Sequence, residues 1–210
     1  GAPSKNGGRD FDIRFLREAT MAIKIYKEKM AYLDKAIEEL PKKSDPKDYR
    51  SSPAVTITWV ENCSGKTKIR DQELISDEND HSTGFGKGVS PGHTFLAGFG
   101  FSHFTQWGRA AGVLDLEIDS LEEQVRGWFD RRGEYLYDLG YEHKGFEEIT
   151  FEVTIRSKES AEKIREFIKW ADRSPPHATL RRAVRLIGIF HLNGKRLTTA
   201  VYHPDRTEWR

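Results

Sequence analysis

The sequence has few of the features that mark several large classes of protein. Its 210 residues include a single cysteine, Cys63, so it forms no internal disulfide and offers no cluster of cysteine ligands. No run reaches the roughly 18 apolar residues of a membrane-spanning helix. The 34 basic and 33 acidic residues leave a net charge of +1, whereas nucleic-acid-binding domains are usually strongly basic. We therefore predict no membrane partner and no nucleic-acid partner. Because the polar first ten residues are unlike a signal peptide, we predict a cytoplasmic protein.

Motifs for cofactors and metals are also missing. Gly65-Lys66-Thr67 is similar to the end of a phosphate-binding loop, but Val60 stands where that motif requires its first glycine. None of the seven histidines belongs to an HExxH pattern. His93 and His103 lie ten residues apart on one predicted helix, about 15 Å along its axis, which is too far to share an ion. We predict no cofactor and no metal, although a metal site assembled from distant segments stays open.

The aromatic content is high enough for a folded domain. The chain has 12 Phe, 7 Tyr and 5 Trp among 37% hydrophobic residues, which favours a packed core over disorder. We divide the chain into four segments: a flexible tail (1–10), an N-terminal helical extension with a linker (11–50), the main domain (51–190) and a C-terminal hairpin arm (191–210).

A heptad-like pattern predicts a long helix over about 11–40, ending at Pro41. Apolar residues recur at steps of three and four, which is the spacing of a helix seam, at Ala19, Ile23, Tyr26, Met30, Leu33, Ile37 and Leu40. Two interpretations stay open. The helix packs on its own domain, or it pairs with a helix of a second subunit, for which three heptads are short.

Alternating and amphipathic patterns predict a mixture of helices and strands. Strands are predicted at 54–60, 66–75, 121–129 and 149–156, and Asn193-Gly194 predicts a tight turn between strands at 183–192 and 196–202. Helices are predicted at 92–111, 160–171 and 178–182, with Ser160 as an N-cap and Pro175-Pro176 as a break. The helix at 92–111 is apolar nearly all round, so we expect it to be buried in the core.

Four segments form a recognisable series: 90–102 (SPGHTFLAGFGFS), 119–127 (DSLEEQVRG), 145–149 (GFEEI) and 171–180 (ADRSPPHATL). In this order and spacing they resemble the OsmC/Ohr family, the osmotically induced and organic hydroperoxide resistance proteins, over about residues 52–190. The resemblance implies an α+β fold in which antiparallel sheets surround central helices and two subunits intertwine as a homodimer. It also implies active sites at the dimer interface. The N-terminal helix and the C-terminal hairpin are additions to that pattern.

The sequence departs from this family at its reactive positions. Ser102 stands where the resemblance places the peroxidatic cysteine, and Ser174 stands where it places the resolving cysteine. Gly92 replaces the catalytic glutamate of the hydroperoxide reductases. A serine hydroxyl cannot pass through a sulfenic acid and a disulfide, so the two-cysteine peroxidase mechanism is closed to this chain.

The first functional hypothesis is a thiol-independent enzyme, a hydrolase or a proton-transfer enzyme, acting on a small apolar or aromatic substrate in the interface pocket. Histidine titrates in the range that suits a general base. The candidate catalytic residues are Ser102, Ser174, His93, His103 and His177. The candidate substrate-binding residues are Phe95, Phe99, Phe101, Gln106 and Trp107, with Lys66 and Arg70 for an anionic group.

Two alternatives stay open. In one, the same pocket holds a hydrophobic ligand without chemistry. In the other, Cys63 supports a residual role in the oxidative stress response, consuming hydroperoxides through a single thiol.

Overall fold

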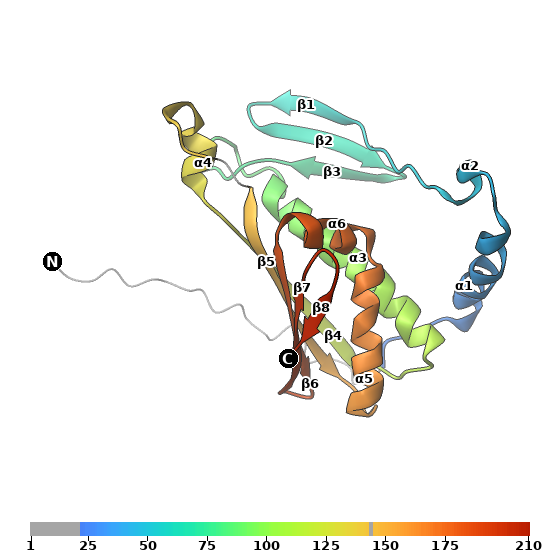
Figure 1. The fold of residues 1–210 in the computed structure, drawn as a ribbon. Coiled ribbons are helices and arrows are strands. Elements are labelled where there is room, and N and C mark those ends of the chain that lie inside the picture. Colours follow the sequence, from blue (N-terminus) through green and yellow to red (C-terminus); the bar gives the residue numbers. More distant parts are fainter. Residues whose placement is uncertain (1–21, 143–144) are drawn as a thin grey trace.

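A computed structural model describes residues 22–142 and 145–210 of the chain. The described residues form an α+β fold with two sheets, of which the smaller is antiparallel and the larger is mixed (Figure 1). A three-stranded sheet has the order β1-β2-β3, and a five-stranded sheet has the order β4-β5-β6-β7-β8. The strands are β1 (Ile57–Glu61), β2 (Ser64–Ile69), β3 (Gln72–Ser76), β4 (Ser120–Phe129), β5 (Phe146–Arg156), β6 (Arg185–Leu192), β7 (Lys195–Tyr202) and β8 (Thr207–Trp209).

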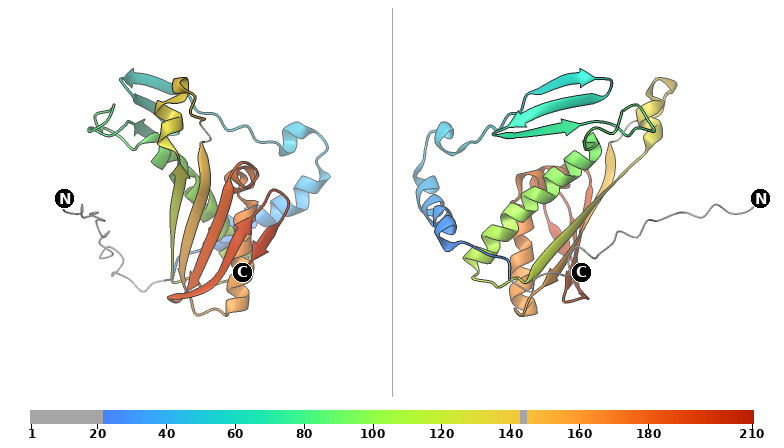
Figure 2. Two further views of the ribbon diagram at one scale, coloured as in Figure 1. Left: turned by 60° about the vertical axis from the view of Figure 1, so that its left-hand side comes forward. Right: turned by 180° about the vertical axis from the view of Figure 1, so that it is seen from behind.

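Helices connect and cover these strands. They are α1 (Lys27–Glu39), α2 (Pro46–Tyr49), α3 (Pro91–Val113), α4 (Arg131–Tyr135), α5 (Ala161–Ile168) and α6 (Pro175–Ala183), with 3-10 turns η2 (Leu40–Lys42), η3 (Tyr137–Leu139) and η4 (Lys169–Arg173). The long helix α3 packs against β4, α5, η4 and α6 (Figure 2). The segment α5-η4-α6 joins β5 to β6, which pair in parallel and therefore need such a crossover connection.

The core lies between the five-stranded sheet and these helices. Along β5, every second side chain is buried, which is the period of a strand with one covered face. The buried apolar residues of β5 meet those of α3, α5 and β6 in one cluster, including Ile149, Phe151, Val153, Ile155, Phe99, Trp107, Ile164, Phe167, Leu186 and Phe190. The main sheet therefore holds α3 firmly along one side of that helix.

The other side of α3 is exposed, so the prediction that this helix is buried all round is wrong. Its buried positions recur three and four residues apart, from Phe99 to Ala111, and so form one stripe. Phe101 lies outside this stripe and is 72% exposed, and Phe95 and Phe104 are also exposed.

The N-terminal extension differs from its prediction. Residues 1–21, which include the predicted tail and Ala19, lie outside the described residues, and α1 begins only at Lys27. No residue of α1 is buried, and Tyr26, Ile37 and Leu40 of the predicted seam are exposed. The helix ends at Glu39 and passes into η2 at Pro41, close to the predicted end. It does touch its own domain, because Met30 lies against Gly112 of α3.

The region predicted as one strand at 66–75 is two strands. β2 and β3 are joined at Arg70-Asp71, where Arg70 adopts a positive φ of 55° that turns the chain back. The three strands stand apart from the five-stranded sheet in Figure 1. A bridge between Ser76 and Val89 ties β3 to the loop that leads into α3.

The second half of the chain follows its prediction closely. Ser160 caps α5 by accepting from the Lys163 amide at 3.4 Å. Pro175 and Pro176, predicted as a break, begin α6, because proline suits the first turn of a helix. The predicted Asn193-Gly194 turn is confirmed, with φ of 49° and 78°. The segment boundary drawn at residue 190 falls inside β6, and β7 and β8 continue the same sheet.

Candidate functional site

Ser102 and Ser174, which stand at the two cysteine positions of the family pattern, meet where α3 contacts α6. Ser174 Oγ donates to Ser102 Oγ at 2.9 Å. Ser174 is fully buried and Ser102 is half-buried. Ser174 is also the N-cap of α6, where its hydroxyl accepts from the backbone N–H of His177 at 3.3 Å. One helix cap therefore holds the second serine in place beside the first.

Two of the predicted histidines meet across the same helix pair. Nε2 of His103 and Nδ1 of His177 are 2.9 Å apart, and both side chains are fully buried. Nδ1 of His103 lies 2.7 Å from Oε1 of Glu123 on β4, whose side chain is also fully buried. The other oxygen of that carboxylate accepts from the Trp107 indole at 3.2 Å. The three groups thus form a hydrogen-bonded row inside the core.

Asp172 of η4 lies at the far end of this row. Its Oδ1 is 3.5 Å from Nε2 of His177, which is an ion-pair separation rather than a formed hydrogen bond. Burial raises the pKa of Asp172, and the charge of Arg181 partly opposes this. Burial lowers the pKa of His177 to about 2, with further lowering from His103 and Arg181. At neutral pH the His177 ring is therefore uncharged.

No imidazole in the described part of the chain is hydrogen-bonded to either Ser102 or Ser174. Both ring nitrogens of His103 and Nδ1 of His177 are taken by the row just described. His93 lies at the exposed start of α3, where its Nδ1 is 2.6 Å from Oγ of Ser90. The predicted catalytic residues thus form a serine pair, a histidine pair and one separate surface histidine.

The predicted substrate-binding residues lie in three different environments. Phe99, Gln106 and Trp107 are buried in the core. Phe95 and Phe101 lie on the exposed side of α3, where Phe95 stacks on Phe146 with ring centroids 5.4 Å apart. Lys66 and Arg70 are exposed on the three-stranded sheet.

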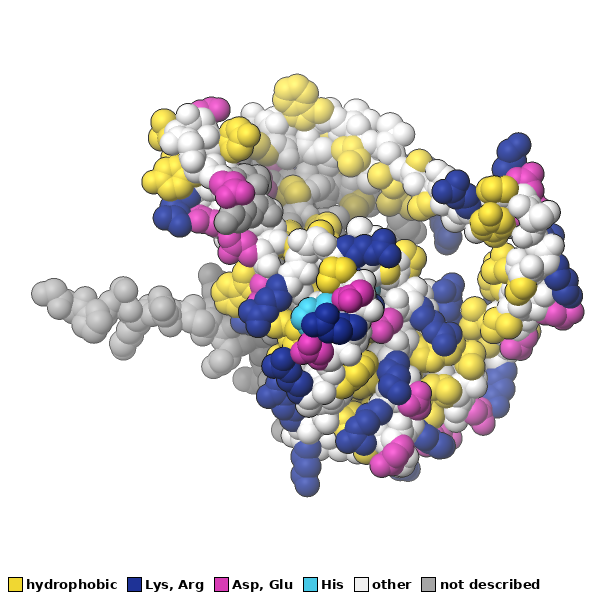
Figure 3. Space-filling view, viewed as in Figure 1, with side chains coloured by type: hydrophobic (Ala, Val, Ile, Leu, Met, Phe, Trp, Pro, Cys, Tyr) yellow, Lys and Arg dark blue, Asp and Glu magenta, His cyan; other side chains and the backbone are white. Residues whose placement is uncertain are grey.

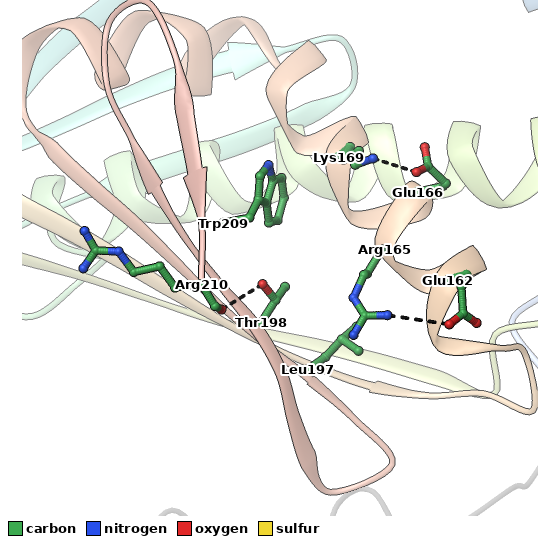
Figure 4. A pocket seen from close by; sticks show the side chains of 8 residues that line it. All are labelled: Glu162, Arg165, Glu166, Lys169, Leu197, Thr198, Trp209 and Arg210. Atoms are coloured by element: carbon green, nitrogen blue, oxygen red, sulfur yellow. Dashed lines mark hydrogen bonds and ion pairs between the residues drawn. The ribbon is translucent and has the colours of Figure 1, made fainter.

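A surface pocket of about 530 Å³ lies elsewhere, between α5 and the C-terminal strands (Figure 4). It is lined by Glu162, Arg165, Glu166, Lys169, Leu197, Thr198, Trp209 and Arg210. Lys169 is 2.6 Å from Glu166, and Arg165 is 3.9 Å from Glu162. Two carboxylates and three cationic side chains line the pocket, so its charges are nearly balanced. None of the predicted site residues lines it.

The described residues contain no group of three or more His, Cys, Asp or Glu side chains placed to hold a metal ion. The row from Glu123 to Asp172 is extended rather than convergent, since each member meets only its neighbours. Among the residues that the structure covers, no helix is long and apolar enough to cross a membrane.

Sequence reasoning missed Glu123 and Asp172. A signal for Glu123 existed in the strand pattern. Leu121, Glu123 and Val125 lie on the same face of β4, and Leu121 and Val125 pack against the core. A carboxylate on that face is expected to find a buried partner. Asp172 carries no such signal, because its position depends on how η4 folds between two helices.

Comparisons with known proteins agree with the observed fold. Residues 84–187 match the model of the OsmC family, described as OsmC-like protein. An OsmC-like protein from Mycoplasma pneumoniae has a TM-score of 0.58 at 23% identity, covering 68% of this chain and 97% of that chain. A hypothetical protein from Aquifex aeolicus VF5 has a TM-score of 0.55 at 13% identity, covering 69% and 98%. An OsmC-like protein of unknown function from Vibrio cholerae has a TM-score of 0.53 at 10% identity, covering 68% and 99%.

Comparison with curated protein sequences gives no match. The structural neighbours establish the fold, and the family model covers α3 and the strands and helices that hold both serines. With serine at positions 102 and 174 and a single cysteine elsewhere, the chain belongs to the OsmC/Ohr family as a divergent member.

Proposed function

We propose that this chain binds a small apolar or aromatic molecule beside Ser102, at a site that a second copy of the chain completes. The proposed function uses neither thiol chemistry nor a serine nucleophile. It keeps the interface pocket that the family resemblance implies and replaces its reactive groups with a polar pair that fixes the ligand's orientation.

The serine pair carries this proposal. A serine hydroxyl becomes a nucleophile only when an adjacent base removes its proton. The Ser174 hydroxyl donates its hydrogen bond to Ser102, and within the described chain no imidazole is hydrogen-bonded to either hydroxyl. The pair therefore resembles a binding contact, which can donate one hydrogen bond from Ser102 and accept others, more than a catalytic one.

The exposed side of α3 supports a second copy as the missing wall. Phe101 is 72% exposed, and Phe104 is exposed one turn further along the helix. Figure 3 shows hydrophobic side chains over the three-stranded sheet, at the top of the view. Trp59 of β1 in this sheet is 78% exposed. Exposed large apolar side chains on neighbouring elements favour an interaction site, and a two-fold dimer would cover the same residues on both subunits.

The alternative role of Cys63 has less support. This cysteine lies in the turn between β1 and β2 of the three-stranded sheet, whereas the two serines lie on α3 and at the start of α6. Its thiol is exposed and lies 3.3 Å from Oγ1 of Thr83. The thiol has no second cysteine to form a disulfide with, so a hydroperoxide cycle would depend on an external reductant.

A fluorescence titration with 1-anilinonaphthalene-8-sulfonate tests binding, because this aromatic probe brightens in apolar sites. We expect saturable binding to the wild type and at least a tenfold weaker affinity in Phe101→Ser, because the substitution removes an exposed aromatic ring of the proposed site. A tenfold loss of affinity corresponds to about 1.4 kcal/mol. Tyr137→Ser is the matched control, because Tyr137 is 67% exposed on η3. Sedimentation at the same concentrations reports whether Phe101→Ser also dissociates a dimer.

Three outcomes contradict the proposal. Equal probe affinity in wild type and Phe101→Ser would remove the site from α3. Turnover of p-nitrophenyl acetate that disappears in Ser102→Ala would establish the hydrolase instead. Consumption of cumene hydroperoxide with dithiothreitol that disappears in Cys63→Ala would establish the thiol-dependent role.

A further inference from the structure

A row of four titratable side chains runs through the core, separate from the serine pair. Glu123, His103, His177 and Asp172 come from β4, α3, α6 and η4 respectively. The successive separations between their facing atoms are 2.7, 2.9 and 3.5 Å. The row begins at a carboxylate with no exposed surface and ends at Asp172, whose side chain is 34% exposed.

Counting protons along the row leaves two arrangements. Glu123 accepts from Trp107 and from Nδ1–H of His103, so His103 Nδ1 keeps its proton in both. One proton must lie between His103 Nε2 and His177 Nδ1. If His177 holds it, His177 Nε2 is an acceptor, and a hydrogen bond at that end of the row requires Asp172 to be the carboxylic acid. If His103 holds it, His103 is an imidazolium and His177 Nε2–H faces an Asp172 carboxylate.

We propose that this row is a buried proton-binding site, which stores one mobile proton and exchanges it with the surface through Asp172. The two arrangements have the same total charge, and the second places a positive charge on His103, beside the carboxylate of Glu123, and a negative charge on Asp172. The tautomer of His177 differs between them and therefore records where the proton is. This inference does not depend on the proposed ligand site.

The transfer between the arrangements balances without any further reactant. The O–H bond of Asp172 breaks as an N–H bond forms at Nε2 of His177. The Nδ1–H bond of His177 breaks as an N–H bond forms at Nε2 of His103. Asp172 is left as a carboxylate, and the new imidazolium of His103 is stabilised by the carboxylate of Glu123, 2.7 Å away. The 3.5 Å separation at Asp172 must shorten for the first step, so this end controls exchange.

The surroundings favour a shared proton over separate charges. Phe99 and Phe151 lie 4.4 and 4.8 Å from the His103 ring, centroid to centroid, and Tyr202 lies 4.2 Å from the His177 ring. Such apolar walls make an unpaired charge costly. The other charged or titratable groups that act on the row are Arg181 on α6 and Tyr202 on β7.

The hydroxyl of Tyr202 adds a buried polar group near the Asp172 end of the row, although its ring is apolar. Its hydroxyl is buried and has no hydrogen-bond partner in the described chain, as do Nε2 of His177 and Oδ1 of Asp172. Burial raises the pKa of Tyr202, and the charge of Asp172 adds to this. Buried polar atoms without partners are rare in folded proteins, and here they gather where the proton must enter.

Nitrogen-15 NMR of the imidazole rings tests the proposal, because protonated and unprotonated ring nitrogens have well-separated shifts. In the wild type we expect both nitrogens of His177 and Nε2 of His103 to show shifts averaged between their two states. Asp172→Asn removes the proton donor, so His177 should be fixed with its proton on Nδ1.

Glu123→Gln should reverse the row. The glutamine oxygen accepts from Trp107, and its NH2 donates to Nδ1 of His103. His103 then donates from Nε2 to His177, whose own proton moves to Nε2. Glu152→Gln is the matched control, because Glu152 lies 2.7 Å from His191 on the same sheet and away from the row.

Opposite His177 tautomers in Asp172→Asn and Glu123→Gln, with averaged wild-type shifts between them, would support the proposal. The same His177 tautomer in all three proteins would overturn it, as would a wild type identical to Asp172→Asn from pH 5 to 8. Should a variant fail to fold, the wild-type shifts alone decide, because fixed and independent shifts at the two rings exclude a shared proton.

Discussion

The buried imidazole of His177 should cost the folded protein stability in acid. Its pKa is about 2 in the folded chain because burial disfavours the charged ring, and about 6.5 in an unfolded chain. Between these values the unfolded chain binds one more proton at this site than the folded chain does. The free energy of unfolding therefore falls as the pH falls below about 6.5.

The size of this effect follows from linkage. One proton corresponds to about 1.4 kcal/mol per pH unit, so the His177 contribution between pH 7 and pH 4.5 is about 2.5 kcal/mol. Asp172 acts in the opposite direction, because its pKa is raised and the folded chain keeps that proton longer as the pH rises. The two contributions oppose each other in the wild type, so a comparison with a variant is needed to separate them.

His177→Gln provides that comparison, because the glutamine amide still donates to Nε2 of His103 but does not titrate. Urea unfolding followed by tryptophan fluorescence gives the free energy of unfolding of both proteins at a fixed protein concentration. The difference between them should change by about 2.5 kcal/mol from pH 7 to pH 4.5. His191→Gln, at a partly exposed ring, controls for the loss of a histidine. Parallel pH curves for wild type and His177→Gln would refute the reasoning.

Two further predictions concern the serine pair and the C-terminal turn. The double variant Ser102→Cys and Ser174→Cys should form a disulfide, because the two oxygens are already 2.9 Å apart, and intact mass after alkylation should show only Cys63 labelled. Asn193→Ala should lose about 2 kcal/mol of unfolding free energy in urea, since Asn193 combines a φ of 49° with side-chain hydrogen bonds to both backbone groups of Ser157. Asn62→Ala, at φ 40° in the turn between β1 and β2, should lose less, and equal losses would contradict the role of those two bonds.

The strands and helices after residue 120 could be predicted because their local patterns and their tertiary roles agree. Alternation over 149–156 matches β5, which has one covered face, and Asn193-Gly194 has the conformational freedom that a tight turn needs. Three of the four family segments, 119–127, 145–149 and 171–180, lie in this region or at its edge, and the family model matches residues 84–187. Local preference and global fold point to the same structure there.

The N-terminal half was harder because its apolar residues lack partners within the described chain. Ile37 of α1 and Ile57 of β1 are exposed, although their spacing suits a helix seam and a strand. On α3 the composition predicts burial on every side, but the fold covers only one stripe. Periodicity reports which residues are apolar, and only the folded arrangement shows which of them its own chain covers.

The candidate site shows why neighbours in sequence can belong to different functions. Ser102 and His103 are consecutive on α3, so their side chains point about 100° apart, one toward Ser174 and the other into the core. Ser174, the N-cap of α6, and His177 in its first turn lie three residues apart, and each meets its partner on α3 at 2.9 Å. The same contact between two helices therefore holds both the serine pair and the proton row. A shift of α6 relative to α3 would lengthen both hydrogen bonds together, which makes the protonation of the core and the geometry at Ser102 interdependent.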